Sequence, residues 1–176
     1  MIYIYKVTIL YLYTMSVKII VAYCKGNGIG KNNSLPWYIP QDLKHFAKLT
    51  KGSNNNMVVM GRNTWDSLPK KPLPKRFNAI LSNHLIIDNE TTKTFNSIQQ
   101  MLEFSRHHGY ETIWIIGGAE VYKTVLEFDM VKEIHVSEID EEHDCDVYFP
   151  EILADKYKLV LEREVGEKIC YKIYRR

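Results

Sequence analysis

One carboxylate stands out among the residues that could do chemistry, because it lies at a helix start beside apolar side chains. Two prolines, Pro36 and Pro40, lead to a predicted helix start, and Asp42 falls in its first turn. Residues three and four apart share a helix face, so Asp42, Leu43 and Phe46 are expected to lie close together. A carboxylate among apolar and aromatic side chains is suited to bind a cationic, amidine-like heterocycle in a cleft.

Two glycine-containing strand ends indicate a second kind of chemistry, the binding of phosphate. Gly117 and Gly118 follow a predicted buried strand over 112–116 and precede a helix. Glycine lets a ligand approach the backbone closely, and the free N–H groups of a helix start attract anions. Gly61 ends another short predicted strand, and Arg62 adds a guanidinium there. Each motif alone also fits an ordinary strand-to-helix turn, but the two together indicate a long anionic cofactor across the sheet edge.

The glycine-rich segment 26–30 matches neither common nucleotide-binding fingerprint. Pro36 and Pro40 follow it where the dinucleotide motif requires a helix, and Asn32 replaces the Ser or Thr of a phosphate-binding loop. The segment is therefore predicted to be a surface loop or, beside a site, a lid. Paired His or Cys spacings and nucleophile motifs are absent from the sequence, so neither a metal site nor covalent catalysis is expected.

The elements that would position these residues alternate between strand and helix. Strands are predicted over 17–24, 57–60, 77–81, 91–95, 112–116 and 131–139, helices over 40–51, 64–68, 97–109 and 118–126, and a hairpin over 157–163 and 168–174. This alternation predicts a single α/β domain. Its central sheet is expected to be mostly parallel, with about eight strands, flanking helices and a C-terminal antiparallel hairpin.

Length and composition agree with one intracellular domain. The chain has 176 residues, of which 45% are hydrophobic and 25% charged, and its net charge of +2 is too small to indicate a nucleic-acid binder. Three widely spaced cysteines indicate a reducing compartment, and so a cytoplasmic location, rather than a disulfide scaffold. Residues 1–14 are apolar but too short to span a bilayer, and they are predicted to be an extension before a natural start at Met15. The domain is then 15–176.

Taken in order, these motifs resemble the dihydrofolate reductase family over nearly everything from Val17 to the C-terminus. The matching segments are Gly28-Ile29-Gly30, Leu35-Pro36-Trp37, Asp42-Leu43 with Phe46, 60–65, 72–76, 80–82, 115–118 and Val121-Tyr122. The resemblance implies an oxidoreductase that reduces 7,8-dihydrofolate to 5,6,7,8-tetrahydrofolate with NADPH. Hydride would pass to C6 and a proton to N5, which feeds one-carbon metabolism and thymidylate synthesis. A monomer that binds antifolate inhibitors, but neither membrane nor nucleic acid, is expected.

The resemblance also assigns the catalytic and substrate-binding residues. Asp42 would hold the 2-amino group and N3 of the pterin and promote protonation at N5, while Trp37 orders a water and Ser137 supports the acid. Arg76 would pair with the α-carboxylate of the glutamate tail. Tyr122 completes the implied catalytic set, and the implied substrate pocket comprises Val21, Ala22, Leu35, Asp42, Leu43, Phe46, Leu68, Leu73, Arg76 and Ile116.

The cofactor residues follow from the same resemblance. They are Ala22, Ile29, Gly30, Gly61, Arg62, Asn63, Thr64, Leu81, Ser82, Asn83, Gly117, Gly118, Ala119, Glu120, Val121 and Tyr122. In the family a cis peptide joins the two consecutive glycines, and Asp146 matches the acid whose loop braces the closed lid. Glu120 departs from the Arg or Ser of many relatives. Because an acid there repels a 2′-phosphate, the preference for NADPH over NADH would rest on Arg62 and His84.

Two other functions remain open from the sequence. One is a related pterin or pyrimidine reductase of the same fold, such as the reductase of riboflavin synthesis. Asp42, Phe46 and Arg76 argue against it, because these residues suit a pterin with a glutamate tail. The other is a non-catalytic protein that contacts nucleic acid through the basic segment 70–76. Burial should raise the pKa of Asp42 and a bound cationic pterin should lower it, and the sequence does not rank these effects.

Overall fold

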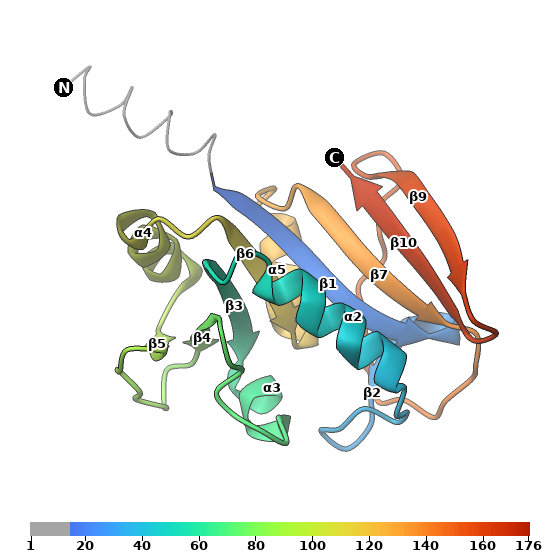
Figure 1. The fold of residues 1–176 in the computed structure, drawn as a ribbon, viewed down its shortest axis with the longest axis horizontal. Helices are drawn as coiled ribbons and strands as arrows, with labels where there is room; N and C mark the ends of the chain where they lie inside the picture. Colours follow the sequence, from blue (N-terminus) through green and yellow to red (C-terminus); the bar gives the residue numbers. More distant parts are fainter. Residues whose placement is uncertain (1–14) are drawn as a thin grey trace.

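The computed structural model describes residues 15–176, and the extension predicted over 1–14 lies outside the described residues. Within them, eight strands form one sheet in the order β5-β4-β3-β6-β1-β7-β10-β9 (Figure 1). The main-sheet strands are β1 (Ser16–Cys24), β3 (Asn56–Gly61), β4 (Phe77–Leu81), β5 (Thr92–Phe95), β6 (Thr112–Gly117), β7 (Glu133–Ile139), β9 (Lys158–Val165) and β10 (Ile169–Arg175). The helices are α2 (Pro40–Lys51), α3 (Arg62–Ser67), α4 (Ile98–His108) and α5 (Ala119–Glu127).

The sheet confirms the predicted fold class. Strands β1, β3, β4, β5, β6 and β7 pair in parallel, whereas β10 pairs antiparallel with both β7 and β9. The last two strands form the predicted C-terminal hairpin around Gly166. Among residues 15–176, no helix is long and apolar enough to cross a lipid bilayer.

Alternating side chains of the central strands build a core on each face of the sheet. In β3, Met57 and Val59 join the cluster that α4 and α5 cover, whereas Val58 and Met60 join the cluster to which Phe46 of α2 contributes. Figure 1 shows α2 crossing in front of the sheet while α5 lies behind it. A strand covered on both faces needs a continuous apolar run, and each such side chain contributes about 1.5 to 3 kcal/mol on burial. The two layers hold α2 in place over the sheet.

Local sequence sets the start of α2 and therefore the position of its acid. Pro40 occupies the first helical position, where its missing N–H needs no partner and its fixed φ suits a helix. The Leu43 N–H donates to the Ile39 carbonyl at 3.2 Å and closes the first turn. Asp42 consequently lies in that first turn, near the positive end of the helix dipole. The predicted bounds of this helix, Pro40 to Lys51, are confirmed.

Several predicted elements differ in detail, most of them by one or two residues at their ends. The predicted loop over 26–30 contains a short strand, β2 (Gly28–Gly30), which pairs with β8 (Val147–Tyr148); this partner lies far along the chain and no local pattern reveals it. Strand β7 begins at Glu133 rather than at residue 131. Leu68 lies just after α3, in extended conformation, because the following Pro69 disfavours helical geometry in the preceding residue.

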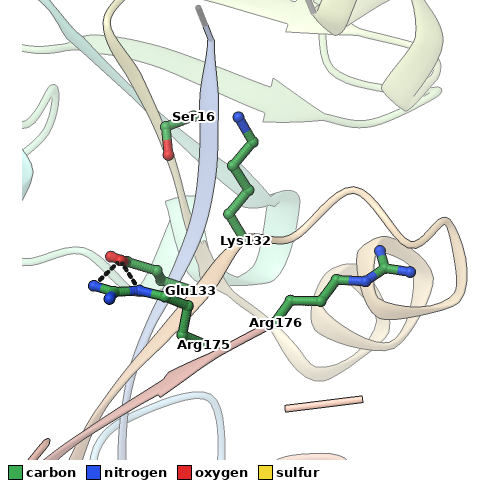
Figure 2. A pocket seen from close by; sticks show the side chains of 5 residues that line it. All are labelled: Ser16, Lys132, Glu133, Arg175 and Arg176. Carbon is green, nitrogen blue, oxygen red and sulfur yellow. Dashed lines mark hydrogen bonds and ion pairs between the residues drawn. The ribbon is translucent and has the colours of Figure 1, made fainter. Parts of the chain in front are cut away.

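A depression of about 380 Å³ lies at the amino edge of the parallel strands, and Figure 2 shows the side chains that line it: Ser16, Lys132, Glu133, Arg175 and Arg176. Glu133 is the acidic side chain that several basic side chains share here. Its carboxylate accepts hydrogen bonds from Lys18 Nζ at 2.7 Å and from Arg175 Nε and Nη2 at 2.9 and 2.7 Å, and His135 Nε2 lies at 3.1 Å. Burial alone would raise the pKa of Glu133, but these partners outweigh it and lower the pKa to about 2.

We expect Glu133→Gln to lower the free energy of unfolding by about 2 kcal/mol at pH 7, because several charge-assisted hydrogen bonds are lost. A carboxylate with a depressed folded-state pKa stabilises the fold above its unfolded pKa and loses this effect as pH falls. The difference between variant and parent should therefore shrink between pH 4.5 and pH 2. Urea denaturation at several pH values measures it, with Glu127→Gln at the exposed end of α5 as the control. An equal difference at pH 7 and pH 2.5 would contradict this assignment.

Candidate active site

The carboxyl edge of the sheet gathers the predicted site residues from five parallel strands. Register places Ala22 of β1 beside Ser137 of β7. In the same way Gly61 of β3 lies beside Leu81 of β4, and Met60 lies beside Gly117 of β6. Carboxyl ends of parallel strands are where ligands bind in open α/β sheets. The depression in Figure 2 lies at the opposite edge and is separate from this site.

Asp42 is almost completely buried, with 7% of its surface exposed. Burial raises the pKa of this carboxyl, and it outweighs the lowering effects of a hydrogen bond from the Ser137 side chain and of nearby His45. Among the effects that the sequence left unranked, burial is the largest on this carboxyl. A buried acid with a raised pKa, next to a hydroxyl that supports it, is a candidate proton-handling group.

Trp37 carries an unpaired hydrogen-bond donor. Its indole Nε1 is buried and has no hydrogen-bond acceptor among the described residues, although its ring lies 5.4 Å from that of His143. A buried N–H without an acceptor is costly, so a water or ligand is expected to satisfy it. Leu35, Tyr38 and Leu43 are 50%, 80% and 42% exposed, so apolar side chains close to the acid in sequence stay accessible to solvent.

An apolar cluster lies between α2 and the sheet. Phe46, Leu68, Leu73 and Ile116 are all partly buried against the same cluster, which includes Ile20. The side chain of Val21 lies instead in the cluster on the opposite face. Alternate residues of a strand point to opposite faces of the sheet, so Ile20 and Ala22 of β1 lie on the face that α2 covers. This alternation was the sequence signal by which Ile20 could have been added to the predicted substrate pocket. Leu49 of α2 packs against the same cluster and was also missed.

Arg76 was expected on the rim of the cleft and is instead buried, with 7% exposed. Its Nη1 donates to Thr50 Oγ1 and its Nε to the Pro74 carbonyl at 3.1 Å, while its guanidinium lies 5.8 Å from the Phe46 ring centre. Burial lowers the pKa of Arg76. Thr50 is fully buried and was missed, although its spacing of four from Phe46 indicates the same helix face. These contacts fix the guanidinium in one orientation.

The glycine turns form a backbone surface without side chains. A cis peptide joins Gly117 and Gly118, as the resemblance implied. A Cβ on Gly118 would lie 3.3 Å from Thr64 Oγ1, and a Cβ on Gly61 would lie 3.3 Å from a methyl of Val121. The missing side chains therefore leave the N–H groups at the start of α5 open to a ligand.

Tyr122 lies next to the glycine turn at Gly117, and its hydroxyl forms a hydrogen bond with the backbone of β1. It is buried and donates to the Ile20 carbonyl at 2.9 Å. Burial raises the pKa of this phenol, so it stays neutral. The hydrogen bond joins α5 to β1 beside Gly117, where a Cβ would lie 3.4 Å from the Tyr122 hydroxyl.

A groove of about 370 Å³ lies along α5, the helix that follows Gly118. It is lined by Leu81, Asn96, Ser97, Ile98, Gln99, Glu120, Val121, Thr124 and Phe128. Arg62 is about half exposed and forms an ion pair with Asp66 at 3.3 Å. Ser82 Oγ accepts from the backbone N–H groups of His84 and Leu85 and shapes the turn after β4. Asn63, Asn83 and Ala119 lie at the same strand-to-helix and strand-to-loop junctions.

The predicted lid is held by the two-stranded β2–β8 sheet. The Asp146 carboxylate accepts from the Asn32 N–H at 3.0 Å, and the Asp146 N–H donates to the Gly30 carbonyl at 3.0 Å. Ile29 packs against the main core. The acid expected to brace the lid thus contacts it directly. Within residues 15–176, no group of three or more His, Cys, Asp or Glu side chains is arranged to hold a metal ion.

Comparison with known proteins agrees with this geometry. A family model described as Dihydrofolate reductase matches residues 16–175. Dihydrofolate reductase of Aedes albopictus is 34% identical over 177 residues, which cover 89% of this chain and 95% of the relative. The enzyme of that name in Buchnera aphidicola subsp. Acyrthosiphon pisum (strain APS) is 36% identical over 154 residues, 88% and 91% of the two chains. Bifunctional dihydrofolate reductase-thymidylate synthase 2 of Arabidopsis thaliana is 36% identical over 80% of this chain and 27% of its own.

Proposed function

Since this chain belongs to the dihydrofolate reductase family, we propose that it reduces 7,8-dihydrofolate with NADPH, with hydride transfer to C6 and protonation at N5. Reduction of dihydrofolate to tetrahydrofolate is the reaction of the family. The observation that supports the finer proposal is a buried carboxylate with a raised pKa, Asp42, on the helix that covers the sheet whose carboxyl edge carries the side-chain-free glycine turns. We propose residues 15–176 as the catalytic domain.

On the substrate side, Asp42 accepts hydrogen bonds from the 2-amino group and N3 of the pterin. This pairing is strong because the carboxylate is buried, where solvent screens a charge-assisted hydrogen bond only weakly. Trp37 directs its unpaired N–H toward a water in the cleft, and that water connects the acid to the substrate. Asp42 promotes protonation at N5 through this water and through substrate tautomers, with Ser137 as a supporting hydroxyl.

The remaining substrate contacts fix position rather than transfer protons. Phe46 and Leu43 pack on the pterin and benzoyl portions, opposite Leu68 and Leu73. Arg76, held by Thr50, presents its remaining N–H groups to the α-carboxylate of the glutamate tail. The proposal therefore pairs the pterin end of the substrate with the negative charge of Asp42 and the glutamate end with the positive charge of Arg76.

The residues present fit a dinucleotide with a reduced nicotinamide, which supplies the hydride when it is bound. Gly117 and Gly118 leave room for the pyrophosphate beside Thr64, and the groove along α5 is suited to the adenine end. Arg62 is the proposed partner of the 2′-phosphate, against the opposing charge of Glu120. The chain positions the two rings and excludes water from between them.

Two properties complete the proposal. We propose an intracellular, reducing location, which is supported by the three cysteines being free thiols. We also propose a monomer that binds antifolates in the Asp42 cleft, because the assigned residues all come from one chain. Size-exclusion chromatography measures the oligomeric state and so tests the proposal of a monomer.

Loss of NADPH absorbance on addition of dihydrofolate tests the proposed function. We expect turnover that depends on both compounds, with Asp42→Asn much slower at neutral pH. An aminopyrimidinone substrate of the riboflavin pathway is the comparison for the alternative reductase. Absence of turnover with dihydrofolate in a folded protein would reject the proposal, and turnover of only the pyrimidine would favour the alternative.

A further inference from the structure

Two cysteines that are far apart in the sequence lie in contact at the base of the lid. The Sγ atoms of Cys24 and Cys145 are 3.7 Å apart, although 121 positions separate the two residues. Both side chains are buried: Cys24 has no exposed surface and Cys145 has 7%. Cys24 is the last residue of β1, and Cys145 lies two residues before β8. The sequence prediction of widely spaced free thiols did not include this contact.

Gly28 provides the space in which the two thiols meet. A Cβ at position 28 would lie 2.5 Å from Cys145 Sγ and 3.0 Å from Cys24 Sγ, so any side chain there would collide with the pair. The backbone holds the Cys145 segment in this place, because the N–H of Phe149 donates to the Asn27 carbonyl at 2.8 Å. The contact is thus fixed from both sides of the lid sheet rather than made by two mobile side chains.

We propose that Cys24 and Cys145 are a redox pair that forms a reversible disulfide with a low-molecular-weight disulfide as the oxidant. The Cys145 thiolate attacks one sulfur of the oxidant and forms a mixed disulfide, which releases one thiolate. Cys24 then loses its proton to solvent and attacks the Cys145 sulfur, which releases the second thiolate. Two protein thiols are oxidised and one small disulfide is reduced to two thiols.

The geometry needs only a small movement. The two sulfurs must approach from 3.7 Å to about 2.0 Å, which is within reach of side-chain rotation and a small shift of the 145–148 segment. Burial raises the pKa of Cys145, so the closed lid protects the thiol and exchange proceeds when the lid sheet opens. Oxidation is therefore expected to be slow in the resting protein.

The disulfide would tie the lid to the main sheet. It links the carboxyl end of β1 to the segment that carries Asp146 and β8, and both of these contact the Gly28–Gly30 strand, Asp146 through the bond from its N–H to the Gly30 carbonyl. A lid that cannot open slows ligand entry and product release. The expected result is a lower kcat in the oxidised protein, and this kinetic consequence rests on the proposed function, whereas formation of the disulfide does not.

The third cysteine provides an internal control. Cys170 lies on β10, is partly exposed, and its Sγ is 3.8 Å from a carboxylate oxygen of Glu162. It has no contact with another cysteine among the described residues. Glutathione would therefore attach to Cys170 as a mixed disulfide and add mass, whereas the proposed pair loses mass.

The experiment treats the full-length protein with oxidised glutathione and follows it by intact mass, peptide mapping and thermal unfolding. In Cys170→Ala, we expect a loss of about 2 Da, a peptide that joins Cys24 to Cys145, and a rise in Tm of roughly 5 to 10 °C. Dithiothreitol should reverse all three changes. Cys24→Ala and Cys145→Ala should show neither the cross-link nor the rise in Tm.

Two outcomes would overturn the proposal. One is the persistence of free thiols at positions 24 and 145 after the lid has been opened with mild denaturant. The other is a mixed disulfide with glutathione at Cys145 that never resolves to the internal bond. Both outcomes are detected by intact mass and peptide mapping, without any assay of dihydrofolate reduction. If the cross-link forms but kcat with dihydrofolate is unchanged, the consequence for the lid is rejected while the redox pair stands.

Discussion

Asp42→Asn lowers kcat/KM for dihydrofolate by roughly 10²- to 10⁴-fold at pH 7, which is the usual contribution of a positioned acid–base group. The side chain keeps its size and its cleft, but the amide cannot take up and release a proton or carry a negative charge against the pterin. Because the substrate can also be protonated directly from water, the remaining activity should increase as pH falls. Initial rates of NADPH oxidation between pH 5 and pH 8 measure this profile.

The same substitution should make the protein without ligand more stable at neutral pH. Burial raises the pKa of Asp42 above its ordinary value of 3.8, so the folded state disfavours the charged form. A raised folded-state pKa lowers stability as pH rises from the unfolded pKa through the folded one, and Asn removes this penalty. Urea denaturation at pH 7 should show a higher free energy of unfolding for Asp42→Asn, and the difference should vanish at low pH.

A matched carboxylate outside the cleft is the control for both effects. Asp155→Asn changes an exposed acid after β8 and should alter neither the pH profile nor the stability by a measurable amount. Near-normal turnover of Asp42→Asn at pH 7 would contradict the role given to this acid. A loss of stability at pH 7 would contradict the conclusion that burial dominates its pKa.

Arg76→Leu raises KM for dihydrofolate by roughly 10- to 100-fold, because charge-assisted bonds to the glutamate α-carboxylate are lost. Dihydropteroate has the same pterin and benzoyl groups but no glutamate, so its KM should not change. The comparison of the two substrates separates loss of a specific contact from general damage to the cleft. Arg76→Lys keeps the charge but not the planar fork, and it should fall between parent and Leu.

The stability of this variant has to be measured alongside. Arg76 is buried and donates to Thr50 Oγ1, so Arg76→Leu leaves a buried hydroxyl without this partner and should cost about 1 to 3 kcal/mol. Lys70→Leu, an exposed cation of the same loop, is the control and should change neither KM nor stability. An equal rise in KM for both substrates would show that Arg76 does not read the glutamate tail.

Local patterns in the sequence determined the elements and the type of site. Pro40 and the glycine at position 52 bound α2, and so place Asp42 in its first turn. Continuous apolar runs in β1, β3 and β6 predict strands covered on both faces, and parallel strands must bring the glycine turns to one edge. These conclusions depend on neighbours within a few residues or on the sheet as a whole.

Tertiary structure alone decided which distant groups meet. The β2–β8 pairing, the Arg76–Thr50 hydrogen bond and the contact between Cys24 and Cys145 join segments separated by 26 to 121 positions, and no local periodicity records such partners. The direction in which the pKa of Asp42 is shifted was also decided by the tertiary structure, because desolvation depends on everything packed around a group. Residue types and spacing therefore specify which chemistry is present, whereas burial and long-range contact decide its strength and what else lies within reach.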